Sequence, residues 1–152
     1  MFNDVSRRYF LKVIAVGAAT SAGALAACSG SSNTDSQALP IGDVKAGNVS
    51  ALAVGEVIPV PGVPAFIGRD ANGVYAMTTT CTHLGCDLAM AKITATYIEC
   101  TCHQSQFDYN GGVVQGPATS PLVHYAVDVA ADGTITIHGG TTVSASTRTA
   151  VA

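Results

Sequence analysis

The sequence of 152 residues predicts an all-β fold, a small antiparallel β barrel or sandwich. Short segments rich in Val, Ile and Tyr alternate with turns that contain Gly, Asn or Asp, a pattern typical of antiparallel hairpins. Beyond residue 28, no window longer than ten residues keeps the helical period of apolar side chains. The chain has the length of one domain of ordinary size, so we expect one sizeable core.

The first 27 residues are predicted to be a signal peptide. Arg7 and Arg8 lie in the sequence SRRYFLK, and an uncharged stretch of 15 residues, 13–27, follows it. That stretch is shorter than the about 20 apolar residues of a membrane-spanning helix, although an uncleaved membrane anchor is the alternative. The segment resembles the twin-arginine export signal, and this resemblance implies export of an already folded protein.

The residue Cys28 ends the apolar stretch in the sequence LAAC, directly before the polar sequence SGSSN. This junction resembles a bacterial lipobox, which implies that Cys28 is acylated, becomes the first mature residue and anchors the protein to a membrane. The alternative is an incidental Cys beside a cleavage site. Residues 28–40 are rich in Ser, Gly, Asn and Asp, so we expect a flexible tether there.

The domain itself is predicted to occupy residues 41–140. Its first strand region is the Val- and Ala-rich segment 49–60, which Gly and Pro interrupt. Two hairpins are expected where short strands flank clear turn signals, at 65–77 and at 125–137, and residues 110–112 mark a further turn. Residues 141–152 are mostly small and polar, and we expect this C-terminal tail to fray.

The charge of the chain excludes one class of partner. Without the leader the chain has four basic and nine acidic residues, a net charge of −5 with His neutral. Such a surface attracts neither nucleic acid nor anionic lipid headgroups, so we expect no nucleic-acid partner. Contact with a membrane would come through the anchor at Cys28 or through a protein partner.

Two short segments hold four of the five Cys and two of the four His residues. The first, 81–86, reads CTHLGC, and the second, 100–108, begins CTCHQS. Two disulfides would leave both His residues without a role, and a structural zinc site usually pairs Cys with Cys and His with His. Here each segment offers Cys and His together, which suits a centre with two thiolates on one metal and two imidazoles on the other.

The order Cys-x-His, sixteen intervening residues and Cys-x-x-His resembles the Rieske family of iron–sulfur proteins. The resemblance implies one [2Fe–2S] cluster as cofactor and a Rieske-type β barrel or sandwich with a two-loop cluster-binding subdomain. Cys81 and Cys100 match the thiolate ligands of the buried iron, and His83 and His103 match the imidazole ligands of the outer iron. The segments 81–86 and 100–108 would be the cluster loops.

Two further cysteines also match this family. Cys86 and Cys102 correspond to the extra pair that forms a disulfide between the two loops in one branch of the family. A disulfide implies an oxidising compartment, in agreement with export. A cluster built in the cytoplasm implies folding before transport, which the twin-arginine route allows. We therefore expect the protein at the periplasmic or outer face of a bacterial membrane, with Cys28 as its lipid anchor.

The resemblance also assigns roles beside the cluster. Ser105 matches a serine whose hydroxyl donates to a bridging sulfide, which raises the reduction potential. Phe107 stands where quinol-oxidising members often carry Tyr, so one donor to a ligand sulfur is missing. Gln104 and Thr101 replace the usual Gly and Pro of the family, which leaves the shape of the loop tip open. Leu84 is expected either to shield the cluster from solvent or to pack within its loop.

Three more features complete the sequence expectations. Residues 116–118, followed by Pro121 and Leu122, resemble the proline loop that covers the third side of the cluster in this family, with an ordinary turn as the alternative. His124 and His138 lie at expected solvent-facing strand positions, without Cys or carboxylate at ligand spacing. We expect both to be ordinary surface residues.

The function implied is the transfer of single electrons through the exposed edges of His83 and His103. Proton uptake by the imidazoles on reduction would suit oxidation of a quinol. We expect an electron-transfer subunit of a respiratory, cytochrome bc-type quinol-oxidising complex, with a cytochrome b or c as redox partner. The alternatives are the small subunit of a periplasmic molybdenum oxidase such as arsenite oxidase, and a free-standing carrier.

Overall fold

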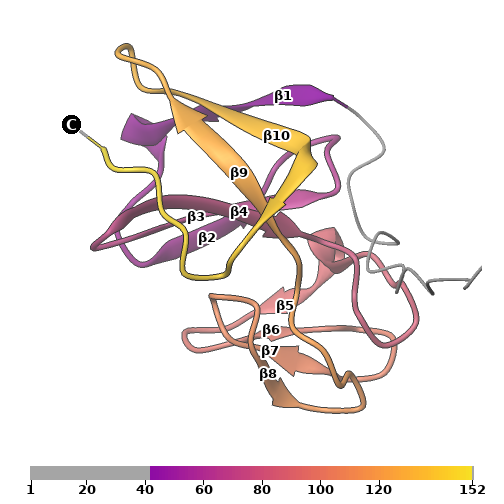
Figure 1. Ribbon diagram of the computed structural model, residues 1–152. Helices are drawn as coiled ribbons and strands as arrows, with labels where there is room; N and C mark the ends of the chain where they lie inside the picture. Colours follow the sequence, from indigo (N-terminus) through magenta and orange to yellow (C-terminus); the bar gives the residue numbers. More distant parts are fainter. Residues whose placement is uncertain (1–41, 152) are drawn as a thin grey trace, which may run out of the picture. The chain divides into compact units, whose positions relative to one another are not determined.

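The structure, a computed structural model, describes residues 42–151 and is nearly all-β, as the sequence predicts (Figure 1). The expected signal peptide, the acylation site Cys28 and the tether 28–40 lie outside the described residues. Within the described range, no helix has both the length and the apolar character needed to cross a membrane. The strands form two antiparallel sheets, one of six strands and one of four.

The six-stranded sheet has the strand order β1-β10-β9-β4-β3-β2. Its strands are β1 (Asp43–Asn48), β2 (Glu56–Pro59), β3 (Ala65–Asp70), β4 (Gly73–Thr78), β9 (His124–Val129) and β10 (Thr134–Val143). The two expected hairpins are β3–β4 and β9–β10. The region 49–60 is strand only in its last part, because it begins with the 3-10 helix η1 (Val49–Ala51), and β1 before it was not expected.

The β3–β4 hairpin shows how local sequence fixes a turn. The Asp70 carboxylate accepts a hydrogen bond from the backbone N–H of Asn72 at 2.8 Å, which closes the turn. Gly73 follows with a φ of +139°, and a Cβ there would lie 2.2 Å from the carbonyl oxygen of Thr149. Only glycine therefore fits at this position, where the C-terminal segment passes the hairpin.

The four-stranded sheet is an insertion between β4 and β9. After η2 (Leu88–Met90) it contains, in the order β5-β6-β7-β8, the strands β5 (Lys92–Ile93), β6 (Ile98–Glu99), β7 (Gln106–Phe107) and β8 (Val113–Gln115). The strands on either side of the insertion are hydrogen-bonded neighbours, with Ala76 paired to Tyr125 and Met77 to His124. The chain therefore leaves the large sheet and returns to it at one place, so the insertion forms a subdomain.

Two clusters of buried side chains fill the domain. One cluster belongs to the large sheet and includes Ile67, Tyr125 and Ile137. The other joins the large sheet to the insertion, because Phe66 and Met77 pack there with residues of the small sheet. This second cluster contains the two reduced cysteines of the described chain and thus forms the floor of the candidate site.

The expectation of a frayed C-terminal tail is wrong. Strand β10 continues to Val143, and the backbone of Thr149 exchanges two 2.9 Å hydrogen bonds with Val74 of β4. Arg148 forms an ion pair with Asp70 at 2.6 Å, and its guanidinium carbon lies 4.1 Å from the centre of the Tyr75 ring. These contacts come from strands far away in the sequence, so the small and polar composition of the tail did not reveal them.

The two histidines outside the cluster loops also differ from expectation. His124 is not solvent-facing: it is 2% exposed and stacks on Tyr75 with ring centres 5.7 Å apart. Burial lowers the pKa of His124, which favours the neutral form of its ring. His138 does lie at the surface, but Asp43 and Asp128 contact its two ring nitrogens at 2.8 and 2.9 Å. Strand pairing brings these carboxylates together, not sequence spacing.

Candidate metal centre

The first cluster loop is a tight turn of six residues, 81–86, between two bridged positions. Thr80 and Asp87 form an isolated β-bridge at its ends. Within it, the backbone N–H of Cys81 donates to the carbonyl of Cys86, and the N–H of Gly85 donates to the carbonyl of Cys81, both at 2.8 Å. These two hydrogen bonds hold the cysteine at the base of the loop and leave the middle residues at its tip.

The second cluster loop, expected at 100–108, closes as a turn over residues 100–105 and has the same construction. It lies between the paired residues Glu99 of β6 and Gln106 of β7. The N–H of Cys100 donates to the carbonyl of Ser105, and the N–H of Gln104 donates to the carbonyl of Cys100, both at 2.9 Å. The two loops therefore present equivalent positions: a buried Cys first and a residue of positive φ fifth.

The two thiols at the loop bases lie side by side in the core. Cys81 is 2% exposed and Cys100 1%, both are reduced, and their side chains are within hydrogen-bonding reach of each other. Burial raises the pKa of the Cys81 thiol, and the backbone N–H of His83 and, to a smaller extent, the hydroxyl of Ser105 act in the opposite direction. Two adjacent buried sulfurs without a disulfide between them are suited to a thiophilic metal.

The two imidazoles lie together at the loop tips. The ring centres of His83 and His103 are 4.7 Å apart and the rings meet edge to face. His103 is exposed, whereas Nδ1 of His83 is buried and has no hydrogen-bond partner among the described residues. A buried ring nitrogen without a partner requires an explanation, and a metal ion bonded to it would supply one. The donor set thus consists of two buried thiols and two imidazoles nearer the surface.

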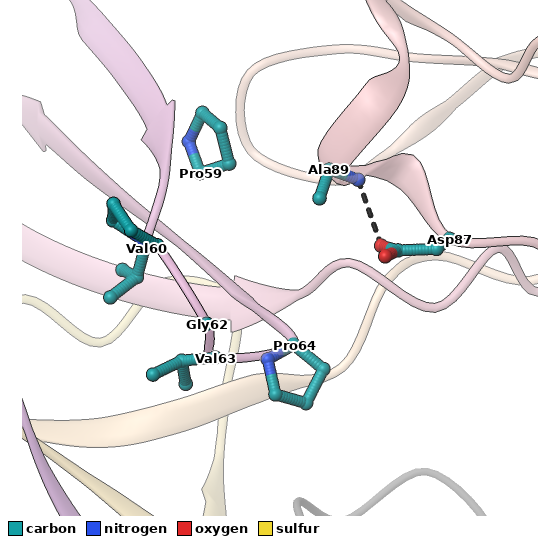
Figure 2. A pocket seen from close by; sticks show the side chains of 8 residues that line it. Pro59, Val60, Gly62, Val63, Pro64, Asp87 and Ala89 are labelled. Carbon is teal, nitrogen blue, oxygen red and sulfur yellow. Dashed lines mark hydrogen bonds between the residues drawn. The ribbon is translucent and has the colours of Figure 1, made fainter.

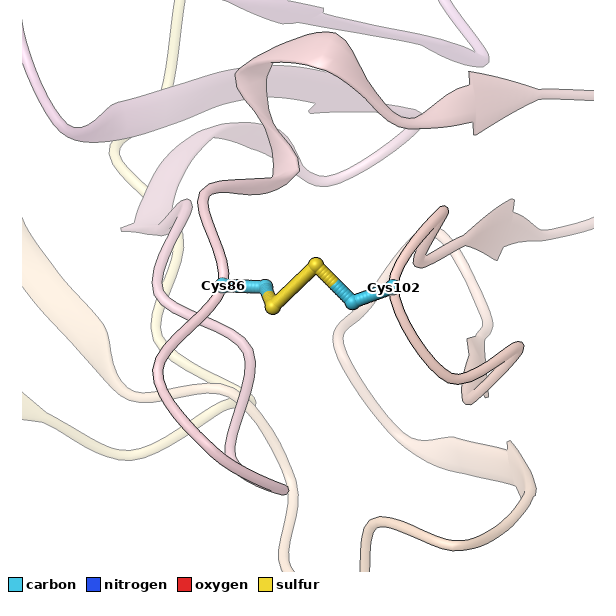
Figure 3. Close-up of a disulfide and its surroundings, with 2 residues drawn as sticks. All are labelled: Cys86 and Cys102. Atoms are coloured by element: carbon cyan, nitrogen blue, oxygen red, sulfur yellow. A yellow bond between two sulfur atoms is a disulfide. The ribbon is translucent and has the colours of Figure 1, made fainter.

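The expected disulfide between the loops is present. Cys86 and Cys102 are bonded, with their Cα atoms 6.6 Å apart (Figure 3). The sulfur of Cys100 lies within 4.8 Å of both sulfurs of this disulfide. Because the disulfide sulfurs are bonded to each other, they are not free as metal ligands, and their role is to hold the two loops together.

A third segment, residues 116–121, contacts both cluster loops. The backbone N–H of Ala118 donates to the hydroxyl oxygen of Ser105 at 3.0 Å. On the other side, the hydroxyl of Thr82 donates to the carbonyl of Ser120 at 2.6 Å. The segment therefore lies against the site as the expected proline loop would. The contact made by Thr82 was missed, since nothing local to CTHLGC indicates a partner 38 residues away.

Two further expectations concern the surroundings of the site. Phe107 is fully buried in the core cluster that contains Cys81 and Cys100, so its ring forms part of the apolar floor. Leu84 does not pack within its loop, because its side chain is 69% exposed. Leu84 therefore presents an apolar side chain to solvent in the loop that carries His83.

A separate hollow of about 390 Å³ lies between the proline-rich segment 59–64 and the start of η2 (Figure 2). Of its lining residues only Asp87 is charged, and this carboxylate already accepts a hydrogen bond from the N–H of Ala89 at 2.9 Å. The hollow therefore offers no second group for a metal. The chemistry of the described chain is concentrated at the cluster loops.

Comparison with known proteins agrees with this geometry. The family model described as "Rieske [2Fe-2S] domain" matches residues 39–126. A protein of Bacillus subtilis (strain 168) named for a Rieske 2Fe-2S centre is 39% identical over 75 residues, 49% of this chain and 14% of that protein. The cytochrome b6-f complex iron-sulfur subunit of Prochlorococcus marinus (strain MIT 9211) is 43% identical over 65 residues, 43% of this chain and 36% of that subunit.

A solved structure shows the same fold. It is the complex of reduced oxygenase and oxidized ferredoxin in carbazole 1,9a-dioxygenase, with a TM-score of 0.51 and 24% sequence identity. The match covers 67% of this chain and 97% of the other. The curated relatives named above are aligned over only about a third of their length or less, so the likeness concerns the domain that carries the two loops.

Proposed function

Because this chain belongs to the Rieske [2Fe-2S] domain family and is a Rieske electron-transfer protein, we propose that its four free donors hold the cluster. The ligands would be the thiolates of Cys81 and Cys100 and the imidazoles of His83 and His103. The observation that carries this assignment is the pair of buried, reduced thiols beneath two imidazoles, one of which has a buried nitrogen without a partner. Bound there, the cluster supplies one-electron reduction and oxidation.

The fold gives each part of the donor set a different environment. The thiols of Cys81 and Cys100 lie in the apolar core, which excludes water from that side. The ring of His103 reaches solvent, so an electron donor or acceptor can approach it. Protons lost or gained by the imidazoles would therefore exchange with solvent or with a bound donor at the exposed face. The disulfide between Cys86 and Cys102 keeps the two loops at a constant separation.

Ser105 is positioned to adjust the redox chemistry. Its hydroxyl accepts the N–H of Ala118, which leaves its own proton free to be donated to the nearby Cys81 sulfur. Such a bond favours the more negative state of the centre and raises its reduction potential. Phe107, which also packs in this core, has no hydroxyl to add a second bond.

The physiological role that we propose is electron transfer within a quinol-oxidising, cytochrome bc-type complex at the outer face of a bacterial membrane. The disulfide supports an oxidising compartment. The resemblance of residues 6–12 to a twin-arginine signal and of the Cys28 junction to a lipobox supports export and lipid anchoring. The likeness to a cytochrome b6-f iron-sulfur subunit supports the quinol-oxidising class.

A second candidate is the small subunit of a periplasmic molybdenum oxidase. Phe107 favours it, because quinol-oxidising members of the family often carry Tyr at the matching position. Quinol-dependent cytochrome reduction, measured in membranes of the source bacterium with and without the gene, distinguishes the two proposed roles. If the protein serves the quinol-oxidising complex, membranes of the deletion strain should lose quinol-dependent cytochrome reduction. The parent gene should restore this activity, and the Cys81→Ser gene should not. Unchanged quinol-dependent activity in the deletion strain would refute the quinol-oxidising role.

A further inference from the structure

The fifth residue of each cluster loop adopts a left-handed backbone conformation. Gly85 has a φ of +77° in the first loop, and Gln104 has a φ of +62° in the second. Gln104 is the sole non-glycine residue with positive φ among residues 42–151. Glycine adopts this conformation freely, whereas a residue with a Cβ is disfavoured there. The loop construction therefore calls for glycine at both positions, and only the first has it.

No contact of the Gln104 side chain within the described residues compensates for this backbone strain. Gln104 is exposed, and its side-chain amide has no hydrogen bond to any residue of the described range. Its backbone N–H makes the same bond that the N–H of Gly85 makes in the other loop. A strained residue that the fold does not need is commonly found where a site binds something.

The surroundings of Gln104 indicate what it could bind. The closed turns 81–86 and 100–105 and the segment 116–121 contain no Asp, Glu, Lys or Arg, although the protein as a whole is acidic and Asp108 lies further along the second loop. The tip offers the exposed apolar side chain of Leu84, the ring of His103 and the amide of Gln104. An uncharged molecule with an apolar ring and hydroxyl groups fits this combination, and a charged partner surface does not.

We propose that Gln104 is a specificity-determining residue whose side-chain amide hydrogen-bonds a hydroxyl of a quinol at the imidazole edge. This assignment rests on the quinol-oxidising function proposed above. One quinol gives up two electrons and two protons and becomes a quinone: two oxidised protein molecules each accept one electron, and the two protons pass to water at the exposed loop tip. The amide takes part in no bond breaking: it positions the hydroxyl while Leu84 contacts the ring.

The test uses the oxidised holoprotein, purified as the full chain, and two reductants. Duroquinol carries hydroxyl groups, whereas reduced methyl viologen has no hydrogen-bonding group. In Gln104→Gly the second-order rate constant for duroquinol should fall about two- to tenfold, the effect of one neutral hydrogen bond. The rate constant with methyl viologen and the reduction potential should stay unchanged, and the unfolding temperature should be equal or higher. Gln104→Asn keeps an amide and tolerates positive φ, so it should restore the rate to within about twofold.

The outcomes separate this assignment from the proposed function. Three results for Gln104→Gly would overturn the role of the amide but leave the quinol function standing. They are an equal loss of rate with both reductants, no loss of rate with duroquinol, and a lower unfolding temperature. A parent protein that methyl viologen reduces and duroquinol does not would overturn the quinol function itself, and the assignment with it.

Discussion

The hydroxyl oxygen of Ser105 accepts a hydrogen bond from the backbone N–H of Ala118 at 3.0 Å. This bond joins the second cluster loop to the segment 116–121 and leaves the hydroxyl proton free to be donated. With one lone pair engaged, the O–H stays free to donate, and the Cys81 sulfur, whose pKa this hydroxyl lowers, is the nearby acceptor. The fully buried hydroxyl of Ser105 thus links the packing of segment 116–121 to the reduction potential of the centre.

Replacing Ser105 by Ala should lower the reduction potential. A hydrogen bond to a charged group contributes roughly 1.5 to 3 kcal/mol, which corresponds to about 65 to 130 mV for one electron. Since both oxidation states accept the bond, we expect a shift of tens of millivolts, below that range. Protein-film voltammetry at one pH measures it, with Ser105→Thr as the control that keeps the hydroxyl. An unchanged potential in Ser105→Ala would show that the hydroxyl does not bond the centre.

Replacing Phe107 by Tyr should raise the potential. The Phe107 ring is fully buried in the cluster of side chains that contains Cys81 and Cys100, so a hydroxyl added there would find a ligand sulfur as acceptor. The expected rise has the same order as the fall in Ser105→Ala. Phe107→Leu is the matched control, because it changes packing without adding a donor. Equal shifts in both variants would assign the effect to packing and contradict the hydrogen bond.

Removing the loop disulfide should weaken both the domain and its hold on the cofactor. The bond between Cys86 and Cys102 closes a segment with a sequence separation of 16, for which a stabilisation of about 3 kcal/mol is typical. The double variant Cys86→Ser, Cys102→Ser leaves no unpaired thiol in its place. Urea unfolding should show the loss, and the visible absorbance of the cluster should decay faster than in the parent. Equal stability and equal decay would mean that packing alone holds the loops.

His138 should make stability fall as pH rises above neutrality. Hydrogen bonds to Asp43, and next to Asp128, raise the pKa of His138 above its ordinary value of about 6.5. A raised folded-state pKa means that the stabilisation is complete below about pH 6.5 and is lost as pH rises through the folded pKa. The carboxylates are well exposed, so the effect is below about 1 kcal/mol. Urea unfolding at pH 5.5 and 8.5 should show this difference in the parent but not in His138→Gln. A direct measure is the His138 titration by NMR, where an ordinary or lowered pKa would contradict the prediction.

The leader can be tested separately from the domain. Changing Arg7 and Arg8 to Lys should leave the protein in the cytoplasm, because the export receptor would read the guanidinium pair and not charge alone. Cys28→Ser should release the exported domain from the membrane, since the acyl anchor is lost. Cell fractionation measures both. A Cys28→Ser protein that stays fully membrane-bound would indicate an uncleaved anchor in place of a lipobox.

The sequence predicted the Cys and His donors of the candidate metal centre because their arrangement depends on spacing within short segments. Cys81 and His83 are two residues apart, Cys100 and His103 three, and each pair lies within one turn, so the chain has little freedom to separate them. The same holds for the two hairpins of the large sheet, whose turn residues and alternating strands are adjacent along the chain. The pairing of Cys86 with Cys102 was predicted from the family resemblance, because the local sequence pattern alone did not specify it.

Contacts between distant strands were decided only by the tertiary structure. The ion pair of Arg148 with Asp70 holds a tail that looks disordered by composition, and the pairing of β4 with β9 buries His124 against Tyr75. The left-handed conformation of Gln104 accompanies the closure of the second loop by the same hydrogen bonds that close the first. These contacts form because packing brings together segments that are remote in the chain. The local conformational preferences of the residues do not determine that packing free energy, so the sequence pattern does not predict the contacts.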